Sequence, residues 1–448
     1  MKRIVIKQAQ VVNEGKITLA DVLIVGERIE NISDSISCNN ADVINAEGLY
    51  LLPGIIDDQV HFREPGLTYK GTIYSESKAA VAGGITSFME MPNTIPNTLT
   101  QKLLEEKYKI ASKTALANYS FFMGINQYNL EEALKTDNEN VCGITDDGLY
   151  FNNDEGILAN YPEFLENLFS RSDNLIALHC EDDAIISKNT YKYQKLYGEN
   201  IPIEFHPLIR SEEACLSATK RVLQIAKKHN NRLHFLHIST QAEANLFENN
   251  LDIREKRITA EACVHHLWFS DKDYEKLGAK IKWNPAIKTE EDKKGILAAL
   301  LDNRLDIIAT DHAPHSIVEK NGTYFKSLSG GPLVQHALPV MLEFFHQGKI
   351  SLEKIVEKMS HHVAEIYRIK ERGYIREGYF ADLVLLDLKN KWTVSAENIL
   401  YKCGWTRFEN QIFKSKILKT FVNGNLVYAD GIINDTNKGK RLKFSKIR

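Results

Sequence analysis

The sequence predicts an α/β protein: a (β/α)8 barrel of the TIM type with a small β subdomain formed by both ends of the chain. Three observations predict this fold. Short apolar runs alternate with amphipathic stretches in the middle of the chain, and both ends have a strand-and-turn texture. The third is length, because 448 residues accommodate a barrel of about 250 residues and a smaller unit. We expect the N-terminal part of the β subdomain at 1–52, the barrel at 53–365, and the C-terminal part with a basic tail at 366–448.

The two ends of the chain predict strands joined by turns. Residues 3–12 alternate apolar and polar side chains, and a second run at 17–26 follows a turn. A third run closes at Pro53-Gly54, a dipeptide that breaks regular structure. The same texture returns at 378–387 and 418–431, where Asn423-Gly424 is typical of a hairpin turn. We therefore expect one sheet to which both termini contribute.

The middle of the chain predicts the eight strands of the barrel. The expected strands are the apolar runs 54–60, 85–91, 117–123, 141–145, 175–179, 233–237, 258–263 and 306–310. Amphipathic stretches at 101–116, 211–229 and 290–301 predict helices between them. This alternation indicates parallel strands connected by helices.

Composition narrows the classes of function. The formal net charge of −3 argues against a nucleic-acid partner, which requires a basic face. The absence of an apolar run near 20 residues argues against a membrane partner, and the N-terminus has no signal-peptide pattern. Six scattered cysteines without a CxxC pair predict reduced thiols and a cytoplasmic protein.

Polar side chains follow most of the predicted strands, and these residues indicate a metal site. In a barrel of this type the carboxyl ends of the strands meet at one mouth, where active sites lie. Histidine and aspartate at that mouth suit Zn²⁺, which can activate water to attack an amide. Each such residue alone has an ordinary structural explanation, but the pattern recurs on several strands. His234 is expected to face away from His237 in the same strand, and adjacent His265 and His266 are expected to point in opposite directions.

Six motifs carry a family resemblance. They are Pro53-Gly54-Ile55-Ile56-Asp57, His61-Phe62-Arg63-Glu64-Pro65-Gly66, Met91-Pro92-Asn93-Thr94, His179-Cys180-Glu181-Asp182, His237-Ile238-Ser239-Thr240 and Ala309-Thr310-Asp311-His312-Ala313-Pro314-His315. Together they resemble the dihydroorotase branch of the amidohydrolase superfamily, over nearly the whole chain. The Met-Pro-Asn-Thr motif favours dihydroorotases over allantoinases. Hydantoinases and dihydropyrimidinases lack the Arg-Glu-Pro-Gly element and resemble the chain less.

The resemblance implies an activity and a set of site residues. The activity is the reversible, zinc-dependent cyclisation of N-carbamoyl-L-aspartate to L-dihydroorotate in pyrimidine biosynthesis, in which water activated by the metal is the nucleophile. The implied metal ligands are His61, Asp147, His179, His237 and Asp311, and Asp311 is also the implied general acid/base. The implied substrate-binding residues are Arg63, Asn93 and His315 for the carboxylate, with Asn284 and the Ser329-Gly330 backbone near the ring. Arg63 suits this role because its planar guanidinium matches a carboxylate.

Two departures from the family pattern bear on the metals. Gln59 stands where the family has the first histidine of a His-x-His pair, and an amide oxygen is a poorer zinc ligand than imidazole. The carboxylated lysine of the fourth strand is also absent, and Asp146-Asp147 follows Thr145 instead. Strand alternation turns one of the two aspartates inward, and we assign the bridging role to Asp147. We expect one or two zinc ions, the second held more weakly.

The resemblance leaves two other functions open. The first is that of a degenerate chain that has lost catalysis and assembles with aspartate transcarbamoylase, and Gln59 favours it. The second is that of another cyclic amidase, such as allantoinase. A homodimer, in which a second copy of the chain is the partner, is also left open.

Overall fold

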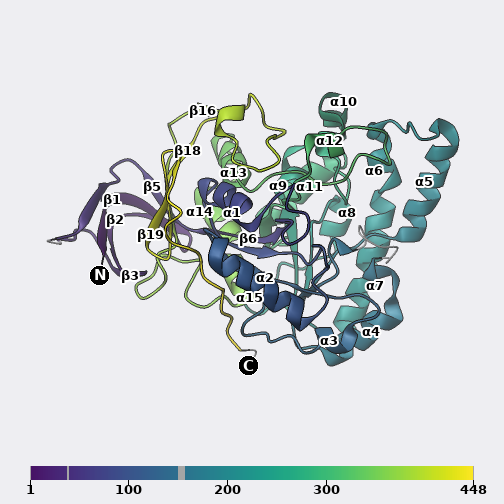
Figure 1. The fold of residues 1–448 in the computed structure, drawn as a ribbon, viewed down its shortest axis with the longest axis horizontal. Helices are drawn as coiled ribbons and strands as arrows, with labels where there is room; N and C mark the ends of the chain where they lie inside the picture. Colours follow the sequence, from purple (N-terminus) through teal and green to yellow (C-terminus); the bar gives the residue numbers. More distant parts are fainter. Residues whose placement is uncertain (1, 38–39, 150–156, 447–448) are drawn as a thin grey trace.

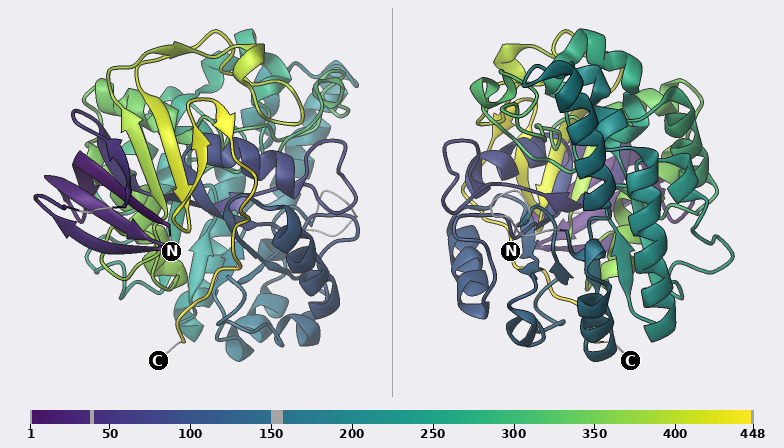
Figure 2. Two further views of the ribbon diagram at one scale, coloured as in Figure 1. Left: turned by 60° about the vertical axis from the view of Figure 1, so that its left-hand side comes forward. Right: turned by 90° about the vertical axis from the view of Figure 1, so that its right-hand side faces the viewer.

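Both ends of the chain form one mixed sheet at one side of the molecule. The computed structural model describes residues 2–37, 40–149 and 157–446. The sheet runs in the order β20-β19-β18-β15-β5-β1-β2-β3, and β4 pairs with β1. Its strands are β1 (Arg3–Asn13), β2 (Lys16–Val25), β3 (Arg28–Ser33), β4 (Asp42–Asn45), β5 (Tyr50–Pro53), β15 (Leu383–Asp387), β18 (Lys416–Val422), β19 (Asn425–Ala429) and β20 (Ile432–Ile433). The N-terminal and C-terminal strands lie side by side in it (Figures 1 and 2).

The barrel contains the eight predicted runs as parallel strands. They are β6 (Ile55–Val60), β7 (Ile85–Glu90), β8 (Asn118–Phe121) continuing as β9 (Met123–Gly124), β10 (Ile144–Thr145), β11 (Ile176–Leu178), β12 (Leu233–Phe235), β13 (Ile258–Cys263) and β14 (Ile307–Ala309). The ring closes between its first and last strands. There Val60 bridges His312 in parallel, and the His61 amide donates to the His312 carbonyl at 2.7 Å.

The helices around the barrel begin at residues that cap them. The main ones are α1 (Ile73–Ala82), α2 (Gln101–Thr114), α4 (Pro162–Arg171), α5 (Asp183–Tyr197), α7 (Glu212–His229), α11 (Glu290–Leu301), α13 (Ala337–His346) and α15 (His362–Tyr367). The hydroxyls of Thr72, Thr100, Ser211 and Thr289 accept from the amide three residues later in α1, α2, α7 and α11. Each cap satisfies an amide that the first helical turn leaves unpaired.

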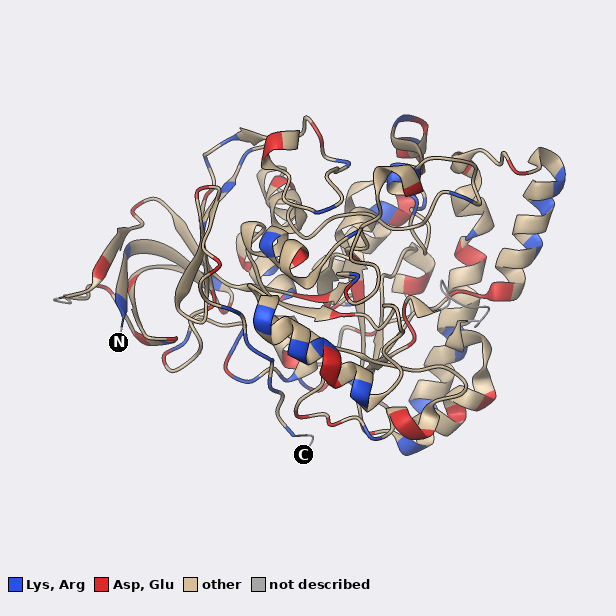
Figure 3. Cartoon of the chain, in the orientation of Figure 1, with Lys and Arg blue, Asp and Glu red and all other residues tan. Residues whose placement is uncertain are grey.

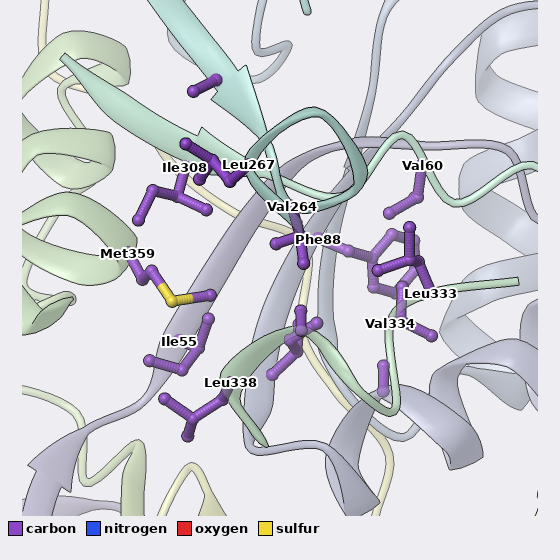
Figure 4. Packing of buried hydrophobic residues seen from close by; sticks show 14 of the residues in the cluster. Ile55, Val60, Phe88, Val264, Leu267, Ile308, Leu333, Val334, Leu338 and Met359 are labelled. Carbon is purple, nitrogen blue, oxygen red and sulfur yellow. The ribbon is translucent and has the colours of Figure 1, made fainter. Parts of the chain in front are cut away.

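Apolar side chains fill the space between the barrel strands and the helices that surround them. Ile55 of β6 lies beside Leu338 of α13 and Met359, and Phe88 of β7 lies beside Leu333 and Val334; all of these side chains are fully or almost fully buried (Figure 4). This packing fixes the barrel strands in place, and the strands in turn position the polar residues that follow them.

Charges of both signs are interspersed along the outer helices (Figure 3). Among the described residues, no helix combines the length and apolar character needed to cross a bilayer. The five described cysteines, Cys142, Cys180, Cys215, Cys263 and Cys403, are free thiols, and Cys38 lies outside the described residues.

Two expectations about histidines were wrong. His234 faces the barrel interior, where Nε2 lies 3.1 Å from Glu261 Oε2. The alternation argument failed because β12 ends at Phe235 and His237 has a left-handed backbone (φ 36°), so the two histidines do not share one strand geometry. His265 and His266 lie in a short helix, α9 (Val264–Trp268), rather than a strand, and both are buried.

Candidate active site

A pocket of about 260 Å³ opens at the carboxyl ends of the barrel strands. The implied site residues that line it are His61, Arg63, Asn93, Asp147, Asn284, Asp311, His315, Ser329 and Gly330. His179 and His237 contact Asp147 and complete the group. The structure thus brings together residues from eight segments of the chain, six of which directly follow a barrel strand, as the fold class predicts.

Asp147 is the common neighbour of three histidines. Its Oδ2 lies 3.2 Å from Nε2 of His61, and its Oδ1 lies 3.7 Å from Nδ1 of His179 and 3.6 Å from Nε2 of His237. Asp311 faces the same nitrogen of His61 at 3.2 Å. Asp146 points elsewhere, because its carboxylate accepts from the amides of Leu158 and His179.

The outer hydrogen bonds of two histidines turn one ring nitrogen of each toward Asp147. Nδ1 of His61 lies 2.7 Å from the Asn93 amide oxygen, which accepts its proton, so in the neutral ring Nε2 carries the lone pair. Nε2 of His179 lies 2.8 Å from the Glu181 carboxylate, which accepts its proton, so in the neutral ring Nδ1 carries the lone pair. Such contacts are typical of metal-binding histidines, because they fix the tautomer and the ring orientation.

The donor set fits a divalent metal of the zinc type. Asp147, His179 and His237 present ligand atoms within 4.8 Å of one another, and all three are buried. Nδ1 of His179 lies only 3.0 Å from Nε2 of His237, so two imidazoles and a carboxylate converge on one point. His61 lies near the other carboxylate oxygen of Asp147 and near Asp311, and these residues would hold a second ion.

Gln59 lies beside this second position, but its side-chain amide forms hydrogen bonds and does not offer a free oxygen to a metal. Its Nε2 donates to Asp147 Oδ2 at 3.2 Å, and its Oε1 lies 3.5 Å from the Cys263 thiol. The side chain therefore supports Asp147 from the place where the family has a ligand.

The charges of the site are tightly coupled when no metal is bound. Burial lowers the pKa of His61, but hydrogen bonds to Asp147 and Asp311 outweigh it and raise that pKa to about 9. Burial likewise lowers the pKa of His237, but the hydrogen bond to Asp147 outweighs it and raises that pKa to about 9. Burial raises the pKa of Asp147, but the hydrogen bonds from His237 and His61 outweigh it and hold that pKa well below its ordinary value.

Several site residues have left-handed backbones. The φ angles are 72° at Arg63, 36° at His237 and 47° at Asp311. This conformation is unfavourable for residues with a side chain and concentrates at functional sites. Gly330 (φ 114°) is needed for a different reason, since a Cβ there would lie 2.7 Å from the Ala313 carbonyl oxygen.

The pocket is also lined by two cationic side chains, Arg63 and Lys70. Arg63 is buried, which lowers its pKa to about 10, and its Nε donates to the Pro314 carbonyl. Lys70 donates to Nδ1 of His315 at 3.0 Å, so Nε2 of that ring carries the proton and donates to the Ser329 carbonyl at 2.8 Å. Burial holds the pKa of His315 well below its ordinary value, so the ring is neutral.

Sequence reasoning missed some residues that line the pocket. Lys70 adds a cationic side chain, Lys282 adds an amine whose pKa burial lowers to about 7, and Trp283 adds an apolar wall. The sequence contained a signal for each of these residues. Lys70 follows Arg63 within the same loop, and Lys282-Trp283 directly precedes Asn284.

Comparisons with known proteins agree with this geometry. The chain is 32% identical to the dihydroorotase of Methanosphaera stadtmanae over 389 residues, which covers 87% of each protein. It is 30% identical to the dihydroorotase of Ehrlichia canis over 428 residues, covering 92% of this chain and 91% of the relative.

Solved structures share the fold. The L-hydantoinase (dihydropyrimidinase) of Arthrobacter aurescens has a TM-score of 0.90 at 23% identity, covering 99% of this chain and all of that one. The dihydropyrimidinase of Brevibacillus agri has a TM-score of 0.87 at the same identity, covering 99% of this chain and all of that one. The profile of the amidohydrolase family matches residues 50–427. The chain belongs to the amidohydrolase family.

Proposed function

We propose that this chain is a cytoplasmic, zinc-dependent dihydroorotase that interconverts N-carbamoyl-L-aspartate and L-dihydroorotate in pyrimidine biosynthesis. The observation that carries the proposal is a single pocket with two faces. One face holds the His61, Asp147 and Asp311 group, and the other holds buried Arg63. Relatives named dihydroorotase, about 30% identical over most of the chain, support the same activity.

The cationic face suits the anionic part of this substrate. Dihydroorotate is a small ring with one carboxylate, and a planar guanidinium can bind a carboxylate through two parallel hydrogen bonds. Arg63 is oriented by the Pro314 carbonyl and lies 3.3 Å from the His315 ring. We infer that Arg63 binds the substrate carboxylate, and that Asn284 and the backbone of Gly330 contact the ring.

The acidic face suits hydrolysis and formation of an amide. We infer that His61, Asp147, His179, His237 and Asp311 hold one or two zinc ions. Bound zinc would supply a Lewis acid that polarises the ring carbonyl and lowers the pKa of water. We infer that the Asp311 carboxylate takes the proton from the attacking water and passes it to the departing ring nitrogen. Cyclisation uses the same proton transfers in reverse.

A purified-protein assay tests this function. We expect the zinc-loaded chain to form dihydroorotate from carbamoyl aspartate, to lose that activity on chelation, and to regain it with zinc. Dihydrouracil, the same ring without the carboxylate, and allantoin are the comparison substrates. Faster turnover of either comparison substrate than of dihydroorotate would contradict the proposal.

Gln59 favours a second candidate function, a non-catalytic partner of aspartate transcarbamoylase. The observation behind it is that the amide of Gln59 hydrogen-bonds to Asp147 where the family has an imidazole ligand. The same assay separates the two. A chain that stays inactive at every zinc concentration but associates with aspartate transcarbamoylase would replace the first proposal with this one.

A further inference from the structure

A second group of potential ligands lies inside the barrel, below the candidate active site. Asp58 of β6, His234 of β12 and Glu261 of β13 point into the interior, and each side chain is fully buried. Asp58 and His234 lie in parallel strands, and each precedes a histidine of the active site, His61 or His237, by three residues. The group therefore lies closer to the amino ends of the strands than the active site does.

One tautomer of His234 leaves its inner nitrogen able to bind a cation. Nδ1 lies 2.8 Å from Oγ1 of Thr259, and the Thr259 hydroxyl lies 3.5 Å from the Leu233 carbonyl oxygen. When the ring proton is on Nδ1, the hydroxyl oxygen accepts it and Nε2 has a lone pair. An outer hydrogen bond of this kind is typical of a metal-binding histidine.

Two carboxylates face that lone pair. Nε2 of His234 lies 3.1 Å from Oε2 of Glu261 and 3.4 Å from Oδ2 of Asp58. Oδ1 of Asp58 is buried without a hydrogen-bond partner among the residues that the structure describes. Acceptors that converge in this way need a positive centre, because a buried carboxylate without one is costly.

The spacing of these atoms suits a metal ion. Tetrahedral zinc has ligands at about 2 Å, which places neighbouring ligand atoms about 3.3 Å apart. The two distances from His234 lie on either side of that value. A single proton would bridge only one pair of the three atoms, whereas a cation would contact all three. Imidazole with carboxylates favours a zinc-like ion over Mg²⁺ or Ca²⁺, which prefer oxygen ligands.

We propose that Asp58, His234 and Glu261 form an additional cation site for a zinc-like divalent metal, separate from the catalytic pocket. The site has its own supports: the Tyr367 hydroxyl donates to Asp58 Oδ2 at 2.8 Å, and the His237 amide donates to Glu261 Oε1 at 2.9 Å. The second contact links this group to the active site. An ion on Glu261 would fix the carboxylate that holds the backbone of His237, an inferred metal ligand of the active site. This inference does not depend on the substrate of the pocket.

Metal content tests the site directly. The purified chain is loaded with zinc, freed of weakly bound metal by gel filtration, and analysed for zinc per chain. Asp58→Asn and His234→Gln each remove a ligand at similar volume, and we expect each to lose one equivalent of zinc. Asp430→Asn is the matched control, because it makes the same change at an exposed carboxylate outside the group, and it should keep the parent's zinc content.

Two further measurements have readouts other than activity. With cobalt in place of zinc, we expect the visible absorption of the parent to contain a contribution that His234→Gln lacks. Crystals of the unaltered chain grown with zinc should show an anomalous peak between the three side chains, which does not require any variant to fold. Equal zinc content in the parent and both ligand variants, or no such peak, would overturn the proposal and leave a shared proton in the group.

Discussion

Nδ1 of His61 lies 2.7 Å from Oδ1 of Asn93, and this contact turns the other ring nitrogen toward Asp147 and Asp311. Asn93 was expected to bind substrate, and it also positions an inferred metal ligand. The two roles explain why a neutral amide lines a pocket rich in charge.

Replacing Asn93 by alanine should weaken both metal binding and turnover. Loss of an outer partner of a metal-binding histidine typically costs about 10- to 100-fold in affinity or activity. Zinc titration and steady-state kinetics measure the two effects. Exposed Asn434→Ala is the control, and an Asn93→Ala chain that matches it in zinc affinity would contradict the positioning role.

Arg63→Met should discriminate between substrates. A charge-assisted hydrogen bond contributes about 1.5–3 kcal/mol, so we expect kcat/KM for dihydroorotate to fall about 10- to 100-fold or more. Hydrolysis of dihydrouracil, which has no carboxylate, should change little. An equal loss for both substrates would mean that Arg63 only maintains the shape of the pocket.

Asp311→Asn should abolish turnover in both directions while the chain stays folded. The amide cannot take a proton from water, and general acid/base groups typically contribute about 10²- to 10⁴-fold. Circular dichroism and zinc analysis separate a catalytic loss from unfolding or metal loss. Near-normal turnover in a zinc-replete variant would exclude the proton-transfer role.

Gln59→His should strengthen zinc binding on the His61 side of Asp147. An imidazole would replace an amide whose nitrogen now donates to Asp147. A competitive chelator titration should show a second, tighter zinc equivalent in the variant. Gln59→Glu is a comparison that adds charge without a nitrogen ligand, and unchanged zinc binding in Gln59→His would place residue 59 outside the metal sphere.

The metal-free protein should lose stability as pH rises from about 6.5 to 9. The pKa values of His61 and His237 are raised to about 9 in the folded chain, so it holds protons that the unfolded chain releases near pH 6.5. This stabilisation is fully present below pH 6.5 and is lost as pH passes through 9. Thermal unfolding of the chelated protein at several pH values measures it, and zinc affinity should rise over the same range because zinc requires neutral imidazoles. A chelated protein more stable at pH 9 than at pH 7 would contradict the assignment.

Sequence patterns predicted the barrel well because its signals are local. Buried parallel strands appear as apolar runs, and the helix predicted at 290–301 has the observed bounds of α11. Boundaries of the short strands were less accurate, because β10 covers only Ile144–Thr145 of the run 141–145. Strand length depends on hydrogen bonds to neighbouring strands, which a pattern of apolar residues does not report.

The site was predicted as a set of residues but not as a network. Strand ends place His61, Asp147 and Asp311 at one mouth, and this much follows from the fold class. The error at His234 arose because its neighbour His237 has a left-handed backbone, which alternation cannot represent. The hydrogen bonds that occupy His315 depend on Lys70 and Ser329 approaching in space, and no single segment of sequence reports that approach.

The shared sheet has a consequence for how the chain is made. Strand β5 pairs with β15, which the ribosome produces only near the end of synthesis. Until then the nascent chain carries an unpaired strand edge beside an almost finished barrel, and such edges promote aggregation. Truncations that remove the last hundred residues should therefore accumulate as aggregates, although they would retain every residue inferred to bind metal or substrate.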